Sequence, residues 1–306
     1  MSSSASQKVI YAALIGNALI AVAKFVAAAF TGSSAMLSEG IHSLVDTGNQ
    51  ILLLYGIRQS KKPADEQFPF GHGKEIYFWS FVVAILIFAV GAGVSIYEGV
   101  QHILIPVPVQ NPAINYLVLA LAMVFEGAAW YFAFREFSRA KGKWGYVEAI
   151  QKGKDPSGFV VLFEDSAAML GLMVAGIGIF LSQMTGILYF DGIASIIIGL
   201  ILGGTAIWLA YETKGLLIGE SANKAVVEDI RRILKSQAEV EYVNDVFTMH
   251  MGPEYILVNL SVDFFDSASA AEIETAVERI DRMIKNSTPK VKRVFIEGEA
   301  RRRIKG

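Results

Sequence analysis

Six long apolar stretches follow one another through the first two thirds of the chain, separated by short polar segments. They cover residues 9–30, 36–57, 77–100, 113–134, 159–181 and 191–211. Each is as long as the roughly 20 residues that an α-helix needs to cross the hydrocarbon core of a bilayer. The pattern therefore predicts an α-helical membrane domain with six transmembrane helices over residues 1–211.

The pattern of apolar positions changes after residue 211, where charged and polar residues become frequent. Residues 223–237 and 269–286 repeat apolar side chains at helical spacing. Residues 243–251, 255–264 and 291–296 have the pattern of strands. In the second strand, four apolar residues alternate with the others: Ile256, Val258, Leu260 and Val262. The order αββαβ predicts a separate, small α+β domain over residues 212–306.

Positive charge is unevenly distributed among the loops between the apolar stretches. Residues 31–35, 101–112 and 182–190 contain no lysine or arginine. The alternate loops contain many: Arg58, Lys61, Lys62 and Lys74, then Arg135, Arg139, Lys141, Lys143, Lys152 and Lys154. Lysine and arginine are enriched on the cytoplasmic side of membrane proteins. The sequence therefore predicts that both termini, and the domain after residue 211, are cytoplasmic.

The amino-acid composition indicates a membrane protein and excludes several kinds of site. Hydrophobic residues make up 53% of the 306-residue chain and charged residues only 18%, which is typical of a membrane protein. The net charge of −2 suggests no nucleic-acid partner. The chain has no cysteine, which excludes disulfides, thiolate metal sites and cysteine nucleophiles. The short, serine-rich start lacks a basic region, so we expect the first apolar stretch to remain in the mature protein.

Two groups of ionisable residues lie inside predicted membrane helices. His42 and Asp46 are four residues apart, which places both on one helix face. Glu164 and Asp165 are adjacent in the fifth stretch. An aspartate at the centre of a membrane helix costs about 2.5–3.5 kcal/mol, so such residues usually serve an ion, a proton or a partner. The structural alternative is a hydrogen-bonded His–Asp pair that joins two helices.

If these helices meet, His42, Asp46 and Asp165 supply three nitrogen and oxygen ligands, and Glu164 or water supplies a fourth. Such a set suits Zn²⁺, with Mn²⁺, Fe²⁺ or Co²⁺ as further candidates. Lys24 is expected to pair with a carboxylate, because lone lysines are poor cation ligands. Glu126 either neutralises Lys24 or lines a water path. Three acidic residues near helix ends are expected to reach the interface: Glu39, Glu98 and Asp191.

A loop between the second and third stretches contains Asp65 and His72, within the segment from Pro63 to Lys74. These two side chains form a possible second cation site, and the alternative is a turn-rich linker with a surface histidine. His102 and His250 have no ligand-spaced partner, so no site is predicted at either.

Several short motifs carry a resemblance that covers nearly the whole chain. They are Asn17 and Lys24 before Thr31-Gly32-Ser33, the His42–Asp46 pair, Phe70-Gly71-His72-Gly73-Lys74, Asp165, and Asp191-Gly192-Ile193-Ala194-Ser195. Together they resemble the cation diffusion facilitator family of zinc-transporter-like proton antiporters. The resemblance implies a six-span transporter with a ferredoxin-like cytoplasmic domain, working as a homodimer. Asp65 and His72 match a metal-binding pair of similar transporters.

The resemblance also identifies one departure. The family site has two ligands on the second span and two on the fifth, four residues apart; His42, Asp46 and Asp165 match, but Val161 occupies the fourth position. Glu164 is then either a substitute ligand or a proton carrier, because adjacent helical residues point about 100° apart. The Glu-Asp sequence resembles a divergent branch that includes mitochondrial zinc-transporter-like members.

These features predict export of a divalent cation, Zn²⁺ first, from the cytoplasm by proton antiport with alternating access. A bacterial inner membrane is the expected location. One alternative is an intramembrane metal-dependent hydrolase that uses Glu39 as a base beside a metal bound to His42. Another is a transporter-derived scaffold or regulator that binds a partner through residues 212–306.

Overall fold

The computed structural model describes residues 3–109, 111–142, 144–154 and 156–301. Lys143 and residues 302–306, which enter the predicted topology and domain boundaries, lie outside this range. The chain forms two compact units. The first contains the residues up to Arg58 and Ile76–Lys214, and the second contains Gln59–Glu75 and the chain from Gly215 onwards.

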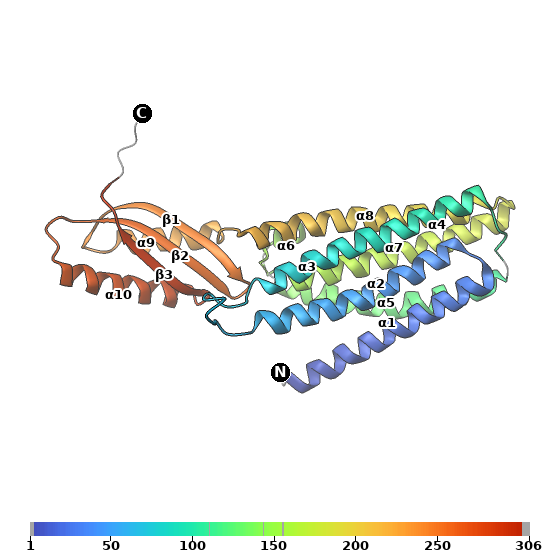
Figure 1. The fold of residues 1–306 in the computed structure, drawn as a ribbon, viewed down its shortest axis with the longest axis horizontal. Coiled ribbons are helices and arrows are strands. Elements are labelled where there is room, and N and C mark those ends of the chain that lie inside the picture. The colour runs from blue at the N-terminus through green and yellow to red at the C-terminus, as the bar shows by residue number, and fades with distance from the viewer. Residues whose placement is uncertain (1–2, 110, 143, 155, 302–306) are drawn as a thin grey trace, which may run out of the picture. The chain divides into compact units, whose positions relative to one another are not determined.

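Helices build the first unit, and its long helices run alongside one another (Figure 1). They are α1 (Ser3–Thr31), α2 (Ser34–Ser60), α3 (Glu75–Leu86), the π-helical segment η1 (Ile87–Ala92), α4 (Gly93–Leu104), α5 (Pro112–Ala140), α6 (Tyr146–Lys152), α7 (Pro156–Thr185) and α8 (Tyr189–Ile218). Each predicted apolar stretch therefore lies within a helix or a run of joined helices. The third stretch is interrupted by η1, and the short helix α6 had no apolar signal.

Four helical segments of the described chain are long and apolar enough to cross a membrane: Glu75–Leu104, Pro112–Arg139, Gly158–Thr185 and Tyr189–Ile218. A shorter apolar segment, Asn17–Thr31, lies in α1. The helix α2 has 27 residues, but its many polar side chains make it less apolar than the others. The chain is a multi-pass membrane protein, and membrane crossing by α1 and α2 stays a prediction.

Large apolar side chains cover the outer faces of the bundle. Leu19, Val124, Phe132 and Leu200 are each more than 60% exposed. Contiguous exposed apolar surface is unfavourable in water and marks contact with a membrane or a partner. A bilayer provides the apolar surroundings that these positions require.

The helices α4 and α8 approach each other closely through glycines. A Cβ atom added at Gly192 of α8 would lie 2.8 Å from the carbonyl oxygen of Gly99 in α4. One turn further along α4, the buried His102 lies near Asp191, the residue before Gly192. Small residues at membrane helix interfaces permit this close backbone contact. The pairing sets α4 directly against the first turns of α8.

The second unit contains a three-stranded sheet, β1 (Val240–Gly252), β2 (Tyr255–Phe264) and β3 (Val291–Gly298), in the order β1-β2-β3. The strand β2 pairs antiparallel with β1 and parallel with β3. The predicted buried face of β2 is confirmed, because the four residues named for it are all buried: Ile256, Val258, Leu260 and Val262. The alternation is incomplete, because Ser261 on the other face is also buried.

Two helices, α9 (Lys224–Lys235) and α10 (Ala270–Ser287), complete this unit. Ile230 and Leu234 of α9 and Ile280 of α10 join the buried residues of β2 in one apolar core. Ser269 caps α10 by accepting from the amide of Glu272, whose carboxylate accepts from the amide of Ser269. The predicted order helix–strand–strand–helix–strand is confirmed, while the ferredoxin-like assignment stays a prediction.

Candidate functional site

The helix α2 holds His42 and Asp46 on one face, as their spacing predicted. Nδ1 of His42 lies 3.5 Å from Oδ1 of Asp46. His42 is 1% exposed, and neither ring nitrogen has a hydrogen-bond partner among the described residues. Burying a polar group without a hydrogen bond costs about 1–3 kcal/mol. The structural alternative of a hydrogen-bonded His–Asp pair is therefore not the arrangement found.

The helix α7 brings Asp165 to the same region. Asp46 and Asp165 line one small cavity together with five other residues: Asn17, Ser43, Glu126, Ala129 and Ala168. The volume open to a water-sized particle is about 10 Å³, close to the minimum for one water molecule. In the described part of the chain, no three His, Asp or Glu side chains are grouped tightly enough to hold a metal ion. The cavity gathers candidate ligands without arranging them as a coordination shell.

Glu164 is buried and is held by a different partner. Its Oε1 accepts a hydrogen bond of 2.9 Å from Nδ2 of Asn49, which follows Asp46 by three residues on α2. Glu164 is absent from the described residues that line the cavity. This separation from Asp165 agrees with the angle between neighbours on a helix. Both of its predicted roles, ligand and proton carrier, stay predictions.

Lys24 forms a buried cluster with two carboxylates. Its Nζ lies 3.0 Å from Oε2 of Glu39 and 2.8 Å from Oε1 of Glu126, and it donates to Ser43 Oγ at 2.8 Å. The predicted pairing of Lys24 with a carboxylate is confirmed, and Glu126 is one of its two partners. The expectation that Glu39 reaches the interface is wrong, because its side chain is 0% exposed. The ion pair with Lys24, 15 residues earlier in the sequence, holds the Glu39 side chain inside the bundle.

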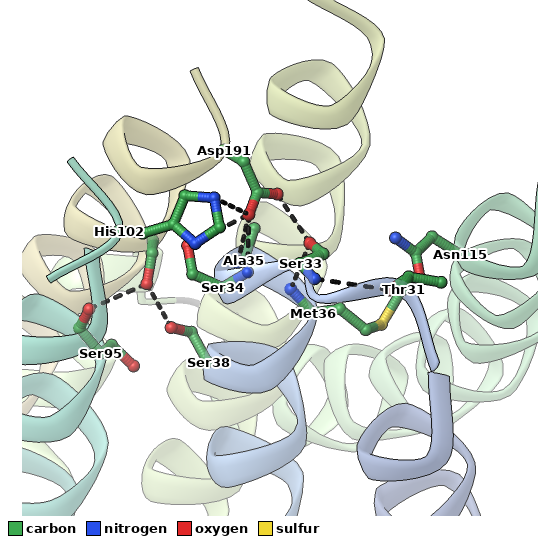
Figure 2. A network of polar contacts seen from close by, with 11 residues as sticks. Thr31, Ser33, Ser34, Ala35, Met36, Ser38, Ser95, His102, Asn115 and Asp191 are labelled. Carbon is green, nitrogen blue, oxygen red and sulfur yellow. Dashed lines mark hydrogen bonds and ion pairs between the residues drawn. The ribbon is translucent and has the colours of Figure 1, made fainter. Parts of the chain in front are cut away.

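Asp191 is also fully buried, so the expectation that it reaches the interface is wrong. Figure 2 shows the polar contacts of its carboxylate. Its carboxylate accepts from Ser33 Oγ at 2.6 Å, from the Ser34 amide at 2.6 Å and hydroxyl at 3.1 Å, and from the Ala35 amide at 3.4 Å. The Nε2 atom of His102 lies 3.7 Å from Asp191 Oδ2. A carboxylate is favourable at a helix N-terminus, where amides lack intrahelical partners.

Sequence reasoning missed this Asp191 network, which consists of Ser33, Ser34, Ala35, His102 and Asp191. The available signal was the serine pair at the start of an apolar stretch, since serine is a preferred helix N-cap. Figure 2 shows how the network joins the first turn of α2 to α4 and α8. It fixes the start of the helix whose later turns carry His42 and Asp46.

The loop residues Asp65 and His72 are brought together. The Nε2 atom of His72 lies 2.9 Å from Asp65 Oδ2, while the Phe68 amide donates to Asp65 Oδ1 at 2.7 Å. The hydrogen bond from His72 and that from the Phe68 amide hold the pKa of Asp65 below its usual range. Both predicted cation ligands are thus engaged within the loop. Cation binding there stays a prediction.

Comparison with known proteins adds to this geometry. Residues 10–218 match the cation efflux transmembrane domain family. The mitochondrial proton-coupled zinc antiporter SLC30A9 of Xenopus laevis is 36% identical over 260 residues, which are 84% of this chain and 46% of that protein. Metal tolerance protein C4 of Arabidopsis thaliana is 30% identical over 85% of this chain and 57% of its own length. The chain spans about half the length of these two relatives.

A bacterial relative is matched over more of its length. The manganese efflux system protein MneP of Bacillus subtilis is 27% identical over 262 residues, which are 84% of each chain. These relatives are named for the transport or tolerance of metals. The family match extends from α1 to the last residue of α8, the helices that hold the cavity and its surrounding carboxylates. The chain therefore belongs to the cation diffusion facilitator family.

Proposed function

We propose that this chain exports a divalent metal cation, Zn²⁺ first, from the cytoplasm in exchange for protons. The observation that supports this most is the buried imidazole of His42, which has no hydrogen-bond partner in the described chain and lies 3.5 Å from Asp46. Asp46 in turn lines the cavity together with Asp165. Neutral imidazole and carboxylates are the ligands that Zn²⁺ takes in cysteine-free sites. Mn²⁺, Fe²⁺ and Co²⁺ remain candidates, and one relative is named for manganese efflux.

The charges around the cavity support exchange of a cation for protons. Three carboxylates line it, those of Asp46, Glu126 and Asp165. Lys24 contacts Glu126 and also Glu39, which is not among the described lining residues. If these four carboxylates and the ammonium of Lys24 were all ionised, the net charge would be −3. Unpaired buried charges cost several kcal/mol each, so this cluster favours either bound protons or a bound dication. Metal binding releases protons from its ligands, which links the two.

The finer parts of the proposal follow from the sequence and the relatives. The chain crosses the membrane six times, with both termini and the second unit in the cytoplasm. It works as a homodimer, and the second unit is ferredoxin-like. A bacterial inner membrane is the proposed location. The Glu-Asp pair at 164 and 165 and the 36% identity to a mitochondrial zinc antiporter support the divergent branch.

The alternative functions lack such support. A metal-dependent hydrolase needs Glu39 as a free base, but Glu39 is paired with Lys24. A scaffold has no use for several carboxylates around an internal cavity, because buried charge is costly. Family membership and the metal-transport names of the relatives also favour a transporter.

Transport by purified protein in liposomes tests the proposal. Zn²⁺ uptake into vesicles with an acidic lumen, followed with a trapped zinc dye, is expected for the wild type and for the control Asp266→Ala, an exposed position of the second unit. His42→Ala and Asp46→Ala should show only background uptake while eluting as folded protein. Wild-type uptake by either variant would overturn the site. Uptake that survives collapse of the pH gradient would overturn proton exchange alone.

A further inference from the structure

Glu126 occupies the cavity without a role in the site described so far. It lies on α5 and lines the cavity together with Asp46 and Asp165. Its Oε1 is 2.8 Å from Lys24 Nζ, whereas its buried Oε2 has no hydrogen-bond partner in the described chain. One carboxylate oxygen of Glu126 is therefore paired with Lys24, and the other is available to a ligand.

The expected donor set is short of one ligand. Zn²⁺ in proteins takes four ligands, and His42, Asp46 and Asp165 supply three. Val161, four residues before Asp165, has no donor atom. Glu164 is held by Asn49, and like His42 it is not among the described residues that line the cavity. Besides Asp46 and Asp165, Glu126 is the ionisable residue among the described residues of the cavity wall.

We propose that Glu126 is the fourth ligand of the transported cation, and that Lys24 is a tethered ammonium that competes with the cation for it. This inference rests on the proposed function of the site. In the structure, the ammonium of Lys24 lies 2.8 Å from Oε1 of Glu126. A dication in the cavity attracts Glu126 away from Lys24, since it carries twice the charge.

Lys24 does not become unpaired when Glu126 moves to the cation. Its three donors are used by Glu39, Ser43 and Glu126. Glu39 keeps its contact of 3.0 Å, and its second oxygen, Oε1, has no hydrogen-bond partner in the described residues. Glu39 therefore retains the ammonium in both states. The exchange involves only short movements of Glu126 between two cations.

The competing explanation is that Glu126 only neutralises Lys24. The two explanations differ in what happens when both charges are removed. A pairing role predicts that Lys24→Gln with Glu126→Gln together restores wild-type metal binding. A ligand role predicts that this double variant stays as weak as Glu126→Gln alone, because the lost oxygen is not replaced.

Calorimetric titration of the purified full-length protein with Zn²⁺, and separately with Mn²⁺, tests this. We expect Glu126→Gln to weaken binding about ten-fold, the size of one lost ligand interaction, and Lys24→Gln to tighten it. Mn²⁺ binding should fall more than Zn²⁺ binding in Glu126→Gln, because Mn²⁺ prefers carboxylate ligands. Wild-type affinity in Glu126→Gln, or in the double variant, would overturn the inference.

His42→Ala separates this failure from failure of the proposed function. If His42→Ala abolishes binding while Glu126→Gln leaves it unchanged, only the role of Glu126 is wrong. If both variants bind as the wild type, the site itself is wrong. Should Lys24→Gln not fold, Glu126→Asp decides the matter. A ligand role predicts that Glu126→Asp binds metal with an affinity between those of Glu126→Gln and the wild type, because the shorter side chain misplaces the ligand oxygen. A pairing role predicts wild-type affinity for Glu126→Asp, because the charge that neutralises Lys24 is kept.

Discussion

The substitution Asp191→Asn tests how much the hydrogen bonds of Asp191 to the first turn of α2 stabilise the fold. The carboxylate accepts from Ser33 Oγ and the Ser34 amide, each at 2.6 Å, and it is fully buried. Asparagine has nearly the same shape as aspartate, but only one of its two terminal atoms is an acceptor oxygen. Its NH₂ group would therefore face one of the hydrogen-bond donors that the carboxylate now accepts from. The loss of one charge-assisted hydrogen bond costs about 1.5–3 kcal/mol. The lost charge at the helix N-terminus costs about 0.3–2 kcal/mol more.

Together these terms lower the free energy of unfolding by about 2–5 kcal/mol. At about 2–4 °C per kcal/mol for a unit of this size, the melting temperature of the detergent-solubilised protein should fall by about 4–20 °C. His102→Gln is the matched control, because His102 meets Asp191 only at 3.7 Å, and its shift should be much smaller. A melting temperature within about 1 °C of wild type for Asp191→Asn would refute this account of the network.

Three further changes test separate parts of the structure. Gly192→Ala places a Cβ atom 2.8 Å from a carbonyl oxygen of α4. A denaturant titration should show a free energy of unfolding that is lower by about 1–3 kcal/mol. The control Gly204→Ala, whose Cβ meets no atom within 4 Å, should leave the free energy of unfolding unchanged. His72→Ala removes the main cause of the lowered pKa of Asp65, so the Asp65 midpoint measured by NMR should rise. A carboxyl group whose pKa is lowered in the folded protein stabilises the fold at pH values above its unfolded pKa, and this stabilisation is lost as the pH falls through the folded pKa. His72→Ala should therefore lose the stabilisation that Asp65 contributes at neutral pH. Glu164→Gln should change the pH dependence of transport, and an unchanged profile would contradict a proton role.

Local patterns of apolar and polar residues predicted the correct helices and strands wherever the cause was local. The apolar stretches lie in helices, and the alternation in residues 255–264 gave the buried face of β2. The four-residue spacing of His42 and Asp46 placed them together on α2. In each case the periodicity of one element decides which side chains are buried.

Contacts between residues far apart in the sequence were not predictable in the same way. Asp191 lies 158 residues from Ser33, its hydrogen-bond donor, and was assigned to the interface because it lies near a helix end. Glu39 was assigned there for the same reason, although Lys24 holds it inside the bundle. Glu126 had two possible roles, since the sequence does not show which helix α5 packs against. Partner choice depends on the packing of whole helices, which periodicity does not specify.

The wide turn η1 determines which residues of α4 meet α8. A π-helical turn bonds i to i+5 and accommodates an extra residue relative to an α-helix. Each residue of an α-helix advances by about 100° around the axis. Deleting one residue between Ile87 and Ala92 would therefore rotate α4 by about that angle and turn Gly99 and His102 away from their partners. The length of this segment, and not only its buried side chains, therefore sets the orientation of α4.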